Sequence, residues 1–305
     1  MKIAYILLAH NNPSQLKRLV DSLKNTGDFY IHIDKKSDIR PFKQIFEGMD
    51  TVHLLKKRVN VTWAGWSMVK GYMLLLKEAL ASENNYDRFV MLTGQDYPLM
   101  SDEEIIKTFE DNRDVEYVMA YNIVTSTVPT DKNKLLKRWY LDNPFRSRFL
   151  QRAYKSVMYH IITEHFEKRE LRVSLNGQTV DPYFGQMLSA FTRKGASLLV
   201  DTYLNDKKYN KSMKTAFAAV EIYWQTVIFN SELRKNTVQH GEEHEITEHF
   251  GWAPLHYHHY DVDTSVFTED DFEELKNCGY MFCRKMAVGK SENLMDKIDE
   301  MRRGK

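Results

Sequence analysis

Residues 89–98 read Phe89-Val-Met-Leu-Thr-Gly-Gln-Asp96-Tyr-Pro98, the pattern of a buried strand that ends abruptly. The apolar run stops at Thr93-Gly94, and an acid follows at Asp96. Pro98 cannot continue a central strand because it has no backbone N–H to donate. In an open α/β sheet, ligands bind outside the carboxyl ends of the strands. The stretch therefore predicts that Asp96 lies where a ligand would bind.

Strands and helices alternate through the first third of the chain. Strand-like apolar runs cover residues 3–9, 29–33, 51–55, 88–92 and 117–121. Between them, apolar residues recur at helical spacing after Ser14, which can cap a helix, and over residues 66–80; Ser101 opens a further helix. This alternation is typical of an α/β fold with a mostly parallel central sheet flanked by helices.

The composition argues against several classes of protein. The 305 residues include 43 Lys and Arg against 42 Asp and Glu, and a net charge of +1 gives no support for a nucleic-acid partner. Cys278 and Cys283 are too few for a disulfide framework or a four-cysteine zinc site. We therefore expect two reduced thiols.

The apolar run at residues 3–9 is short and has no small-residue cleavage site behind it, so a strand is expected rather than a signal peptide. No stretch approaches the roughly 18 apolar residues that a membrane span needs. These patterns predict a cytoplasmic protein without a transmembrane segment, and they leave peripheral association with a membrane open.

Polar residues follow the first two predicted strands. His10 comes directly after the first strand and Asp34 after the second, so both should lie at one edge of the sheet. Asp34 could bind a ribose hydroxyl or a base imino group, or it could be a turn residue that binds its own backbone. His10 could bind the same ligand or be a packed ring. A Gly-rich phosphate loop is missing after the first strand, which excludes a dinucleotide fingerprint or P-loop.

Two further positions could carry chemistry. Trp63 and Trp66 flank Ala64-Gly65 before a helix, where the rings could stack on a base or sugar or pack in the core. Glu221 lies among apolar residues at the start of a helix predicted over 219–230. Burial would raise its pKa toward that of a general base, although the acid could instead complement the helix dipole.

Metal ligands are also conceivable in the second half. Histidines and acids crowd residues 240–259, but the H-E-x-x-H order is missing and a surface loop is the simpler interpretation. Asp261-Val-Asp263 is formally a D-x-D pair, although it lies far from the fourth strand. We do not expect a bound metal.

Six strings occur in a fixed order along residues 3–285. They are His32-Ile-Asp34-Lys-Lys-Ser37, Trp63-Ala-Gly-Trp66-Ser67-Met-Val69, Leu92-Thr-Gly-Gln-Asp96-Tyr-Pro-Leu-Met-Ser101, Tyr183-Phe-Gly185, Val220-Glu221-Ile-Tyr-Trp-Gln-Thr226 and Phe282-Cys-Arg-Lys285. Together they resemble the core-2/I-branching family of β-1,6-N-acetylglucosaminyltransferases, which also includes protein xylosyltransferases. The chain looks like a small bacterial member without the Golgi anchor of the animal enzymes.

The resemblance implies a GT-A type fold, a UDP-sugar donor of the N-acetylglucosamine or xylose class, a glycan or glycolipid acceptor, and inversion at the anomeric carbon. It implies no metal cofactor, because Lys285 would take the charge of the leaving diphosphate, and it matches Glu221 to the catalytic base. The remaining residues are expected at the donor (His10, Asp34, Trp63, Asp96, Arg284) and at the acceptor (Tyr183, Gly185, Trp224). A role in bacterial surface polysaccharide or glycolipid synthesis would follow.

The domain organisation follows from the same resemblance. We expect one domain, residues 1–305, with a nucleotide-binding half at 1–122 and an acceptor-binding and catalytic half at 123–305. Within the second half, residues 125–178 are basic and aromatic, which fits either a solvated helical insertion or a flexible acceptor-binding region.

The chain departs from the family at one point. Members often carry an Arg upstream of the lysine, and residues 260–266 contain neither Arg nor Lys. Arg284 or a nearby His could substitute, or Asp261 and Asp263 could recruit Mn²⁺ or Mg²⁺. A degenerate member that binds a nucleotide sugar or glycan without transferring it is the alternative. A sugar nucleotidyltransferase would need a Gly-rich basic loop where His10-Asn-Asn-Pro13 stands.

Overall fold

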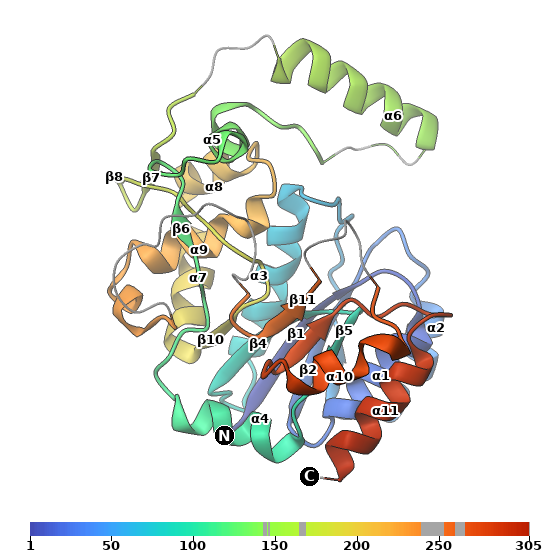
Figure 1. Cartoon of the computed structure of the whole chain (residues 1–305). Coiled ribbons are helices and arrows are strands. Elements are labelled where there is room, and N and C mark those ends of the chain that lie inside the picture. The colour runs from blue at the N-terminus through green and yellow to red at the C-terminus, as the bar shows by residue number, and fades with distance from the viewer. Residues whose placement is uncertain (143–144, 146, 165–168, 239–252, 260–265, 305) are drawn as a thin grey trace.

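The computed structural model describes residues 1–142, 145, 147–164, 169–238, 253–259 and 266–304. Its centre is a five-stranded sheet in the order β10-β4-β1-β2-β3 (Figure 1). The strands are β1 (Ile3–Ala9), β2 (Gly27–Ile33), β3 (Val52–Leu54), β4 (Arg88–Thr93) and β10 (Ala190–Thr192). Only β10 is antiparallel to its neighbour. The mostly parallel α/β sheet expected from the sequence is confirmed.

Helices cover both faces of this sheet because alternate strand residues point to opposite sides. Ala4 and Ile6 of β1 belong to one apolar core, and Ile3, Tyr5 and Leu7 belong to the other. The first core is closed by α3 (Trp66–Leu80), α7 (Arg193–Asn205), α8 (Lys207–Met213) and α9 (Tyr223–Phe229). The second is closed by α1 (Pro13–Leu23), α2 (Arg40–Ile45) and α4 (Asp102–Asp111).

A second sheet continues from the end of β4. It has the order β11-β12-β5, formed by β11 (His256–His258), β12 (Phe282–Arg284) and β5 (Asp96–Pro98). A third apolar core joins it to α10 (Phe272–Asn277) and α11 (Glu292–Arg303). Both cysteines are free thiols, as expected.

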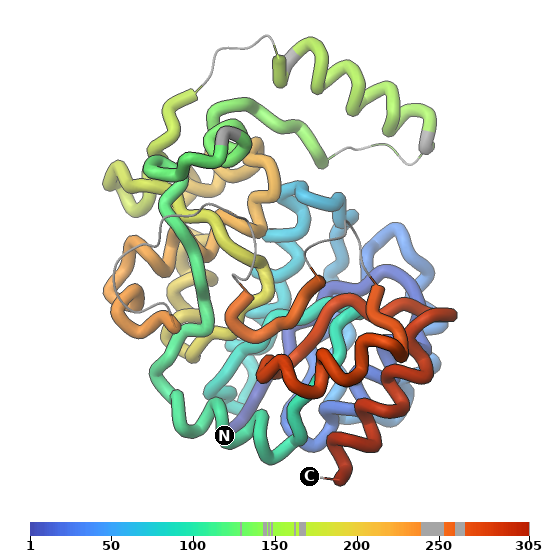
Figure 2. The backbone as a smooth tube through the Cα atoms, viewed as in Figure 1, coloured from blue at the N-terminus to red at the C-terminus, as the bar shows by residue number. Residues whose placement is uncertain are grey.

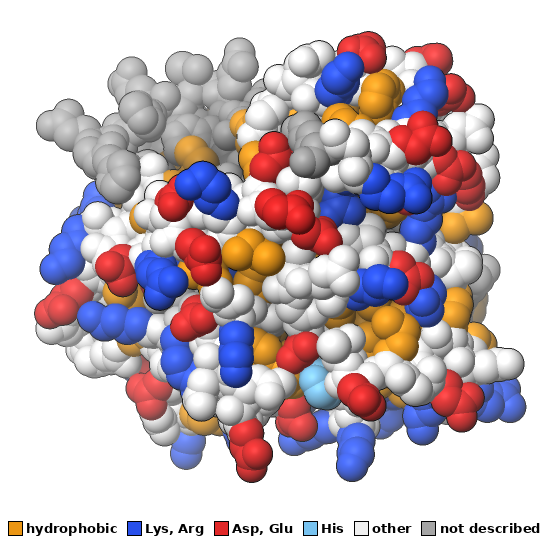
Figure 3. Space-filling model, turned by 90° about the horizontal axis from the view of Figure 1, so that it is seen from below, with side chains coloured by type: hydrophobic (Ala, Val, Ile, Leu, Met, Phe, Trp, Pro, Cys, Tyr) orange, Lys and Arg blue, Asp and Glu red, His pale blue; other side chains and the backbone are white. Residues whose placement is uncertain are grey.

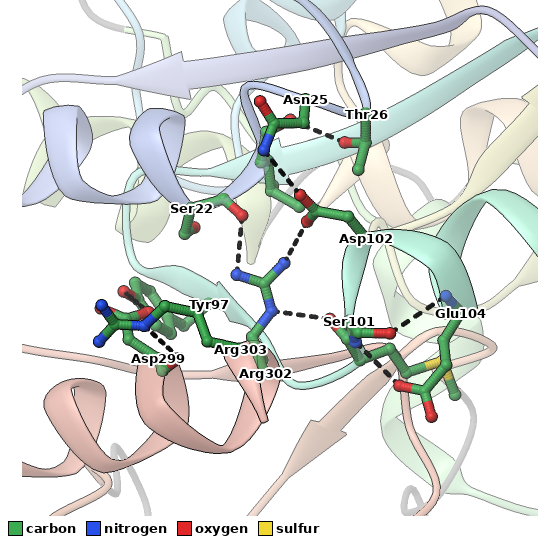
Figure 4. A network of polar contacts seen from close by, with 12 residues as sticks. Ser22, Asn25, Thr26, Tyr97, Ser101, Asp102, Glu104, Asp299, Arg302 and Arg303 are labelled. Atoms are coloured by element: carbon green, nitrogen blue, oxygen red, sulfur yellow. Dashed lines mark hydrogen bonds and ion pairs between the residues drawn. The ribbon is translucent and has the colours of Figure 1, made fainter. Parts of the chain in front are cut away.

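Arg302 of α11 fastens this layer to the main sheet (Figure 4). Its guanidinium donates three hydrogen bonds of 2.7 Å each, to the carbonyl of Ser22, the carbonyl of Met100 and the carboxylate of Asp102. Ser22 lies on α1, and Asp102 begins α4 behind the predicted Ser101 cap, which forms a capping box with Glu104. Hydrogen bonds therefore connect the last helix, α11, to α1 and α4 in the first third of the chain.

Two expectations about elements are wrong. Residues 117–121 do not form a strand of the main sheet: Tyr117 makes one isolated bridge to Ala190, and β6 (Tyr121–Asn122) pairs instead with β9 (Tyr183–Phe184). The neighbouring Glu116 is buried and accepts from the backbone N–H of Thr192, which turns the chain away from the sheet.

The other error concerns the start of α1. Ser14 does not cap it, because the helix begins at Pro13, whose fixed φ suits the first helical position.

The basic segment is partly helical. It contains α5 (Pro129–Leu136), α6 (Arg148–Val157), a wider helical turn over Met158–Thr163 and the hairpin of β7 (Val173–Leu175) and β8 (Gln178–Val180). Of these elements, α5 and β7 contribute Leu135, Val173 and Leu175 to the first core. Figures 1 and 2 show α6 projecting above α5 and α8. Among the residues that the structure describes, a helix long and apolar enough to cross a membrane is not found.

Candidate functional site

A cavity of about 570 Å³ opens where β1, β2 and β4 end. His10 follows β1, Asp34 follows β2, and Gly94 and Gln95 follow β4, so the parallel strands deliver all four residues to one place. The cavity brings together six residues that the sequence singled out: His10, Asp34, Trp63, Glu221, Arg284 and Lys285.

Asp34 shapes one end of the cavity as well as lining it. Its buried carboxylate accepts the backbone N–H of Lys36 at 3.0 Å and of Val61 at 3.3 Å, and the Lys36 ammonium lies 3.3 Å from the other oxygen. The turn interpretation is confirmed, since the carboxylate binds the backbone of two loops. Binding of a ribose or a base stays a prediction for this residue, which also lines the cavity. His10 is an exposed ring at the rim.

Trp63 offers an open aromatic face to the cavity. The side chain is 78% exposed, and its edge-on neighbour is Phe217 at a centroid distance of 5.8 Å. A large apolar ring left in water is costly unless a ligand covers it, and flat rings such as a base or sugar are suitable partners. Trp66, in contrast, is buried against Tyr223.

Asp96 lies behind the cavity rather than in its lining. It accepts from the Thr93 backbone N–H at 2.7 Å, from the Thr93 hydroxyl at 2.9 Å and from the Arg284 guanidinium at 2.9 Å. Burial alone would raise the pKa of Asp96, but the charge of Arg284 and the nearby His256 ring hold that pKa well below its usual range. The carboxylate thus holds the Arg284 guanidinium at the cavity and is not itself part of the lining.

Removing this support should cost stability. We expect Asp96→Ala to lower the free energy of unfolding by about 3 kcal/mol, because it leaves the largely buried Arg284 charge without its partner. Urea unfolding measures the change. The control is Asp38→Ala, which breaks the exposed pair with Arg40 and should barely change stability. An equal effect of the two substitutions would contradict this role of Asp96.

Glu221 also lines the cavity, and a strained turn holds it there. Ala218 has a φ of 51°, residues 219–221 form one 3-10 turn, and only then does α9 begin, so the single helix expected over 219–230 is divided. Burial raises the pKa of Glu221 to about 7, which the Lys134 ammonium only partly opposes. Across the described ranges, the Glu221 carboxylate has no hydrogen-bond donor, so it is available to an incoming hydroxyl.

The three expected acceptor residues do not line the cavity. Tyr183 stacks on Phe229 and Trp224 is fully buried edge-on to Tyr72. The Gly185 N–H donates to the carbonyl of Glu221 at 2.9 Å, and a Cβ at Gly185 would lie 2.0 Å from the carbonyl oxygen of Met119. Their positions support the Glu221 turn from behind.

Other lining residues were missed from sequence. Gln95, Phe217 and His258 all face the cavity. The expectation of a surface loop is wrong for His256 and His258, because both lie in β11 beside β12 and His256 is buried. Burial, with the Arg284 charge nearby, lowers the pKa of His258 to about 3. β11 and β12 are too short to show the alternation of apolar and polar residues by which a strand is recognised in a sequence.

The lining carries three cations, Lys36, Arg284 and Lys285, against the acids Asp34 and Glu221. Lys285 has no carboxylate partner among the described residues. A group with metal-ligand spacing, His259, Asp271 and Glu274, exists elsewhere in the described structure and does not line the cavity. His240, His244, His249, Asp261 and Asp263 lie outside the described residues.

A family model and two curated relatives match the chain. Residues 3–276 match the sequence model of the Core-2/I-Branching enzyme. Human "Xylosyltransferase 2" is 29% identical over 150 residues, 48% of this chain and 16% of that protein. A human beta-1,3-galactosyl-O-glycosyl-glycoprotein beta-1,6-N-acetylglucosaminyltransferase is 27% identical over 143 residues, 45% of this chain and 32% of that protein.

Solved structures resemble the chain only distantly. A 4-diphosphocytidyl-2C-methyl-D-erythritol synthase from Anaerococcus prevotii covers 67% of this chain and 76% of its own, with 18% identity and a TM-score of 0.33. The bifunctional glycosyltransferase WbbM covers 98% and 48%, with 9% identity and a TM-score of 0.38. The family model matches most of the chain, residues 3–276, and this chain therefore belongs to the Core-2/I-branching enzyme family.

Proposed function

We propose that the chain is an inverting glycosyltransferase of GT-A type that moves a sugar from a UDP-linked donor to a hydroxyl of a glycan or glycolipid. One observation carries the proposal: a carboxyl group with a pKa of about 7, Glu221, shares a cavity with the cations Arg284 and Lys285. Transfer needs a base for the acceptor hydroxyl and positive charge for the departing diphosphate. The family membership and the mostly parallel sheet support the same activity.

The proposed reaction is a single displacement. Ionised Glu221 takes the proton of the acceptor hydroxyl while its oxygen bonds to the anomeric carbon. On the opposite side, the bond from that carbon to the diphosphate breaks, and UDP leaves with the electron pair. The anomeric configuration is thereby inverted, which gives a β-linkage from an α-linked donor.

Two ends of the cavity suit the two parts of the donor. Asp34 and His10 lie at strand ends that would take the nucleoside, with the Trp63 ring available for stacking. Arg284, held by Asp96, and Lys285 would meet the diphosphate. In this scheme these cations supply the charge that Mn²⁺ or Mg²⁺ supplies elsewhere, so transfer would need no metal.

The pH dependence of transfer should report on Glu221. The group acts as a base only when ionised, so kcat/KM should rise with pH and level off above about 7. Below that value we expect a loss of about tenfold per pH unit, as for one proton. A profile that is flat between pH 5 and pH 8 would show that Glu221 is not the base.

Thermal-shift measurements test the donor, with UDP and UDP-sugars each in EDTA or with Mn²⁺. A ligand that binds the folded state raises its melting temperature by mass action. We expect a shift that survives EDTA, together with release of UDP when an acceptor is added. A shift without transfer or donor hydrolysis would favour a binding module, and a shift only with Mn²⁺ would refute metal independence.

A further inference from the structure

Helix α6 exposes apolar side chains that nothing in the described structure covers. On α6, Phe149 is 77% exposed, Leu150 is 45% exposed and Val157 is 47% exposed. Ile161, in the turn that follows α6, is 58% exposed. Large side chains of this kind are normally buried when a helix packs on its own protein. Their exposure on one projecting element (Figure 2) indicates a partner outside the molecule.

The helix has two sharply different faces. At 100° per residue, Phe149, Leu150 and Val157 fall on one side, and Arg152 and Lys155 fall on the other. Arg152 and Lys155 are exposed and have no acidic partner within the described part of the chain. An amphipathic helix with a basic polar face and Phe or Leu on the other face is suited to lie in a lipid–water interface.

The surface beneath α6 extends the positive charge. A groove of about 590 Å³ is lined by five cations, Arg138, Arg169, Lys208, Lys211 and Lys214, and by one acid, Asp142.

The helical turn Met158–Thr163, which follows α6, contacts the edge of this groove. The Tyr159 ring contacts Trp139 at 6.0 Å, and Thr163 donates to the Arg138 carbonyl at 2.8 Å.

The opposite end of the molecule differs. Seen from below (Figure 3), Lys and Arg side chains are interspersed with Asp and Glu, and hydrophobic side chains form only small, separate patches. The groove is different, since its lining holds five cations and one acid in a chain whose net charge is only +1.

We propose that α6 docks the protein on an anionic lipid bilayer. Phe149, Leu150 and Val157 insert at the level of the headgroups, while Arg152, Lys155 and the cations of the groove meet lipid phosphates. This attachment goes beyond the proposed transfer reaction and does not depend on it. If both hold, the acceptor enters from the membrane surface, which suits a sugar acceptor carried on a lipid.

Flotation with lipid vesicles tests the docking. We expect the full chain to float with phosphatidylcholine vesicles that contain about 30% phosphatidylglycerol, and to bind at least about tenfold more weakly to pure phosphatidylcholine. Binding should fall when salt is raised from about 0.1 M to about 0.5 M, because screening shortens the reach of the charges. Absence of binding to the anionic vesicles, or equal binding to both, would overturn the proposal.

Matched variants separate the two faces. Phe149→Asp with Val157→Asp and, separately, Arg152→Glu with Lys155→Glu should each weaken binding to anionic vesicles by about tenfold or more. Val288→Asp, at another exposed apolar residue, and Lys43→Glu with Lys107→Glu, on α2 and α4, are the controls and should bind as the unaltered chain does. Unchanged binding of both α6 variants would refute docking through this helix.

Two further measurements, the melting temperature and the rate of transfer, show whether a loss of vesicle binding is due to lost docking. All variants change exposed residues, so equal melting temperatures should show that each is folded. Transfer to a water-soluble acceptor should be unchanged in the α6 variants, which separates a failure of docking from a failure of the proposed reaction. A stable dimer that the Phe149→Asp change dissolves would instead make α6 a contact between copies and would overturn the proposal.

Discussion

Glu221→Gln is expected to reduce kcat for sugar transfer by about 10³-fold, because an amide cannot accept the proton of the acceptor hydroxyl. The substitution keeps the size and shape of the side chain, so donor binding should be unchanged in a thermal-shift titration with UDP. The measurement is UDP release at saturating donor and acceptor, at a pH above 7. Transfer at the unaltered rate would refute the mechanism.

The same variant also tests the raised pKa of Glu221 through the pH dependence of stability. The pKa of Glu221 is raised from its ordinary value of 4.5 to about 7, so ionisation costs more in the folded than in the unfolded chain. The unaltered protein therefore loses stability as pH rises from 4.5 through 7. Glutamine does not ionise, and Glu221→Gln should melt at a higher temperature than the unaltered chain at pH 8 but not at pH 4. Glu232→Gln, at an exposed acid, should change neither activity nor this pH dependence.

Lys285→Ala is expected to lower kcat by about 10²- to 10³-fold, because the departing diphosphate loses a nearby positive charge that matters most as its bond breaks. KM for the donor should rise much less than kcat falls, since the charge on the diphosphate is greater in the transition state than in the bound donor. Lys285→Arg should restore part of the rate. Steady-state kinetics with a UDP-sugar gives both parameters.

A nearby lysine provides the control for that experiment. Lys290 is exposed, five residues further along, and outside the cavity lining, so Lys290→Ala should leave both parameters unchanged. Equal losses from the two alanine variants would mean that bulk charge, rather than the position of Lys285, is responsible. Full activity of Lys285→Ala would remove this residue from the mechanism.

The parts of the fold that sequence could predict are those with local periodicity. The apolar runs of β1, β2 and β4 and the buried helix α3 were located because their patterns repeat within a few residues. The error at residues 117–121 arose because this run is as apolar as a buried strand, yet the chain turns away from the main sheet at buried Glu116. The hydrogen-bond partner of Glu116 is Thr192, 76 positions later in the sequence. Such a contact leaves no trace in a local pattern.

The candidate site divides along the same line. His10 and Asp34 follow from strand ends and Glu221 from its apolar neighbours, whereas Arg284 and Lys285 came from resemblance to a family. Asp96 was singled out by its strand end, but it lies behind the lining, and its partner Arg284 is 188 positions away, in a strand antiparallel to β5. Sequence could therefore point to each of the two residues but not to the ion pair that they form.

That pairing of β5 with β12 has a consequence for the order in which the protein is made. Asp96 leaves the ribosome long before Arg284 does. Arg302, which connects α11 to α1 and α4 by hydrogen bonds, is made later still. Until then the end of β4 has its carboxylate but not the guanidinium that neutralises it. We therefore expect the nascent chain to acquire affinity for a nucleotide sugar only near the end of translation, after the earlier strands have paired.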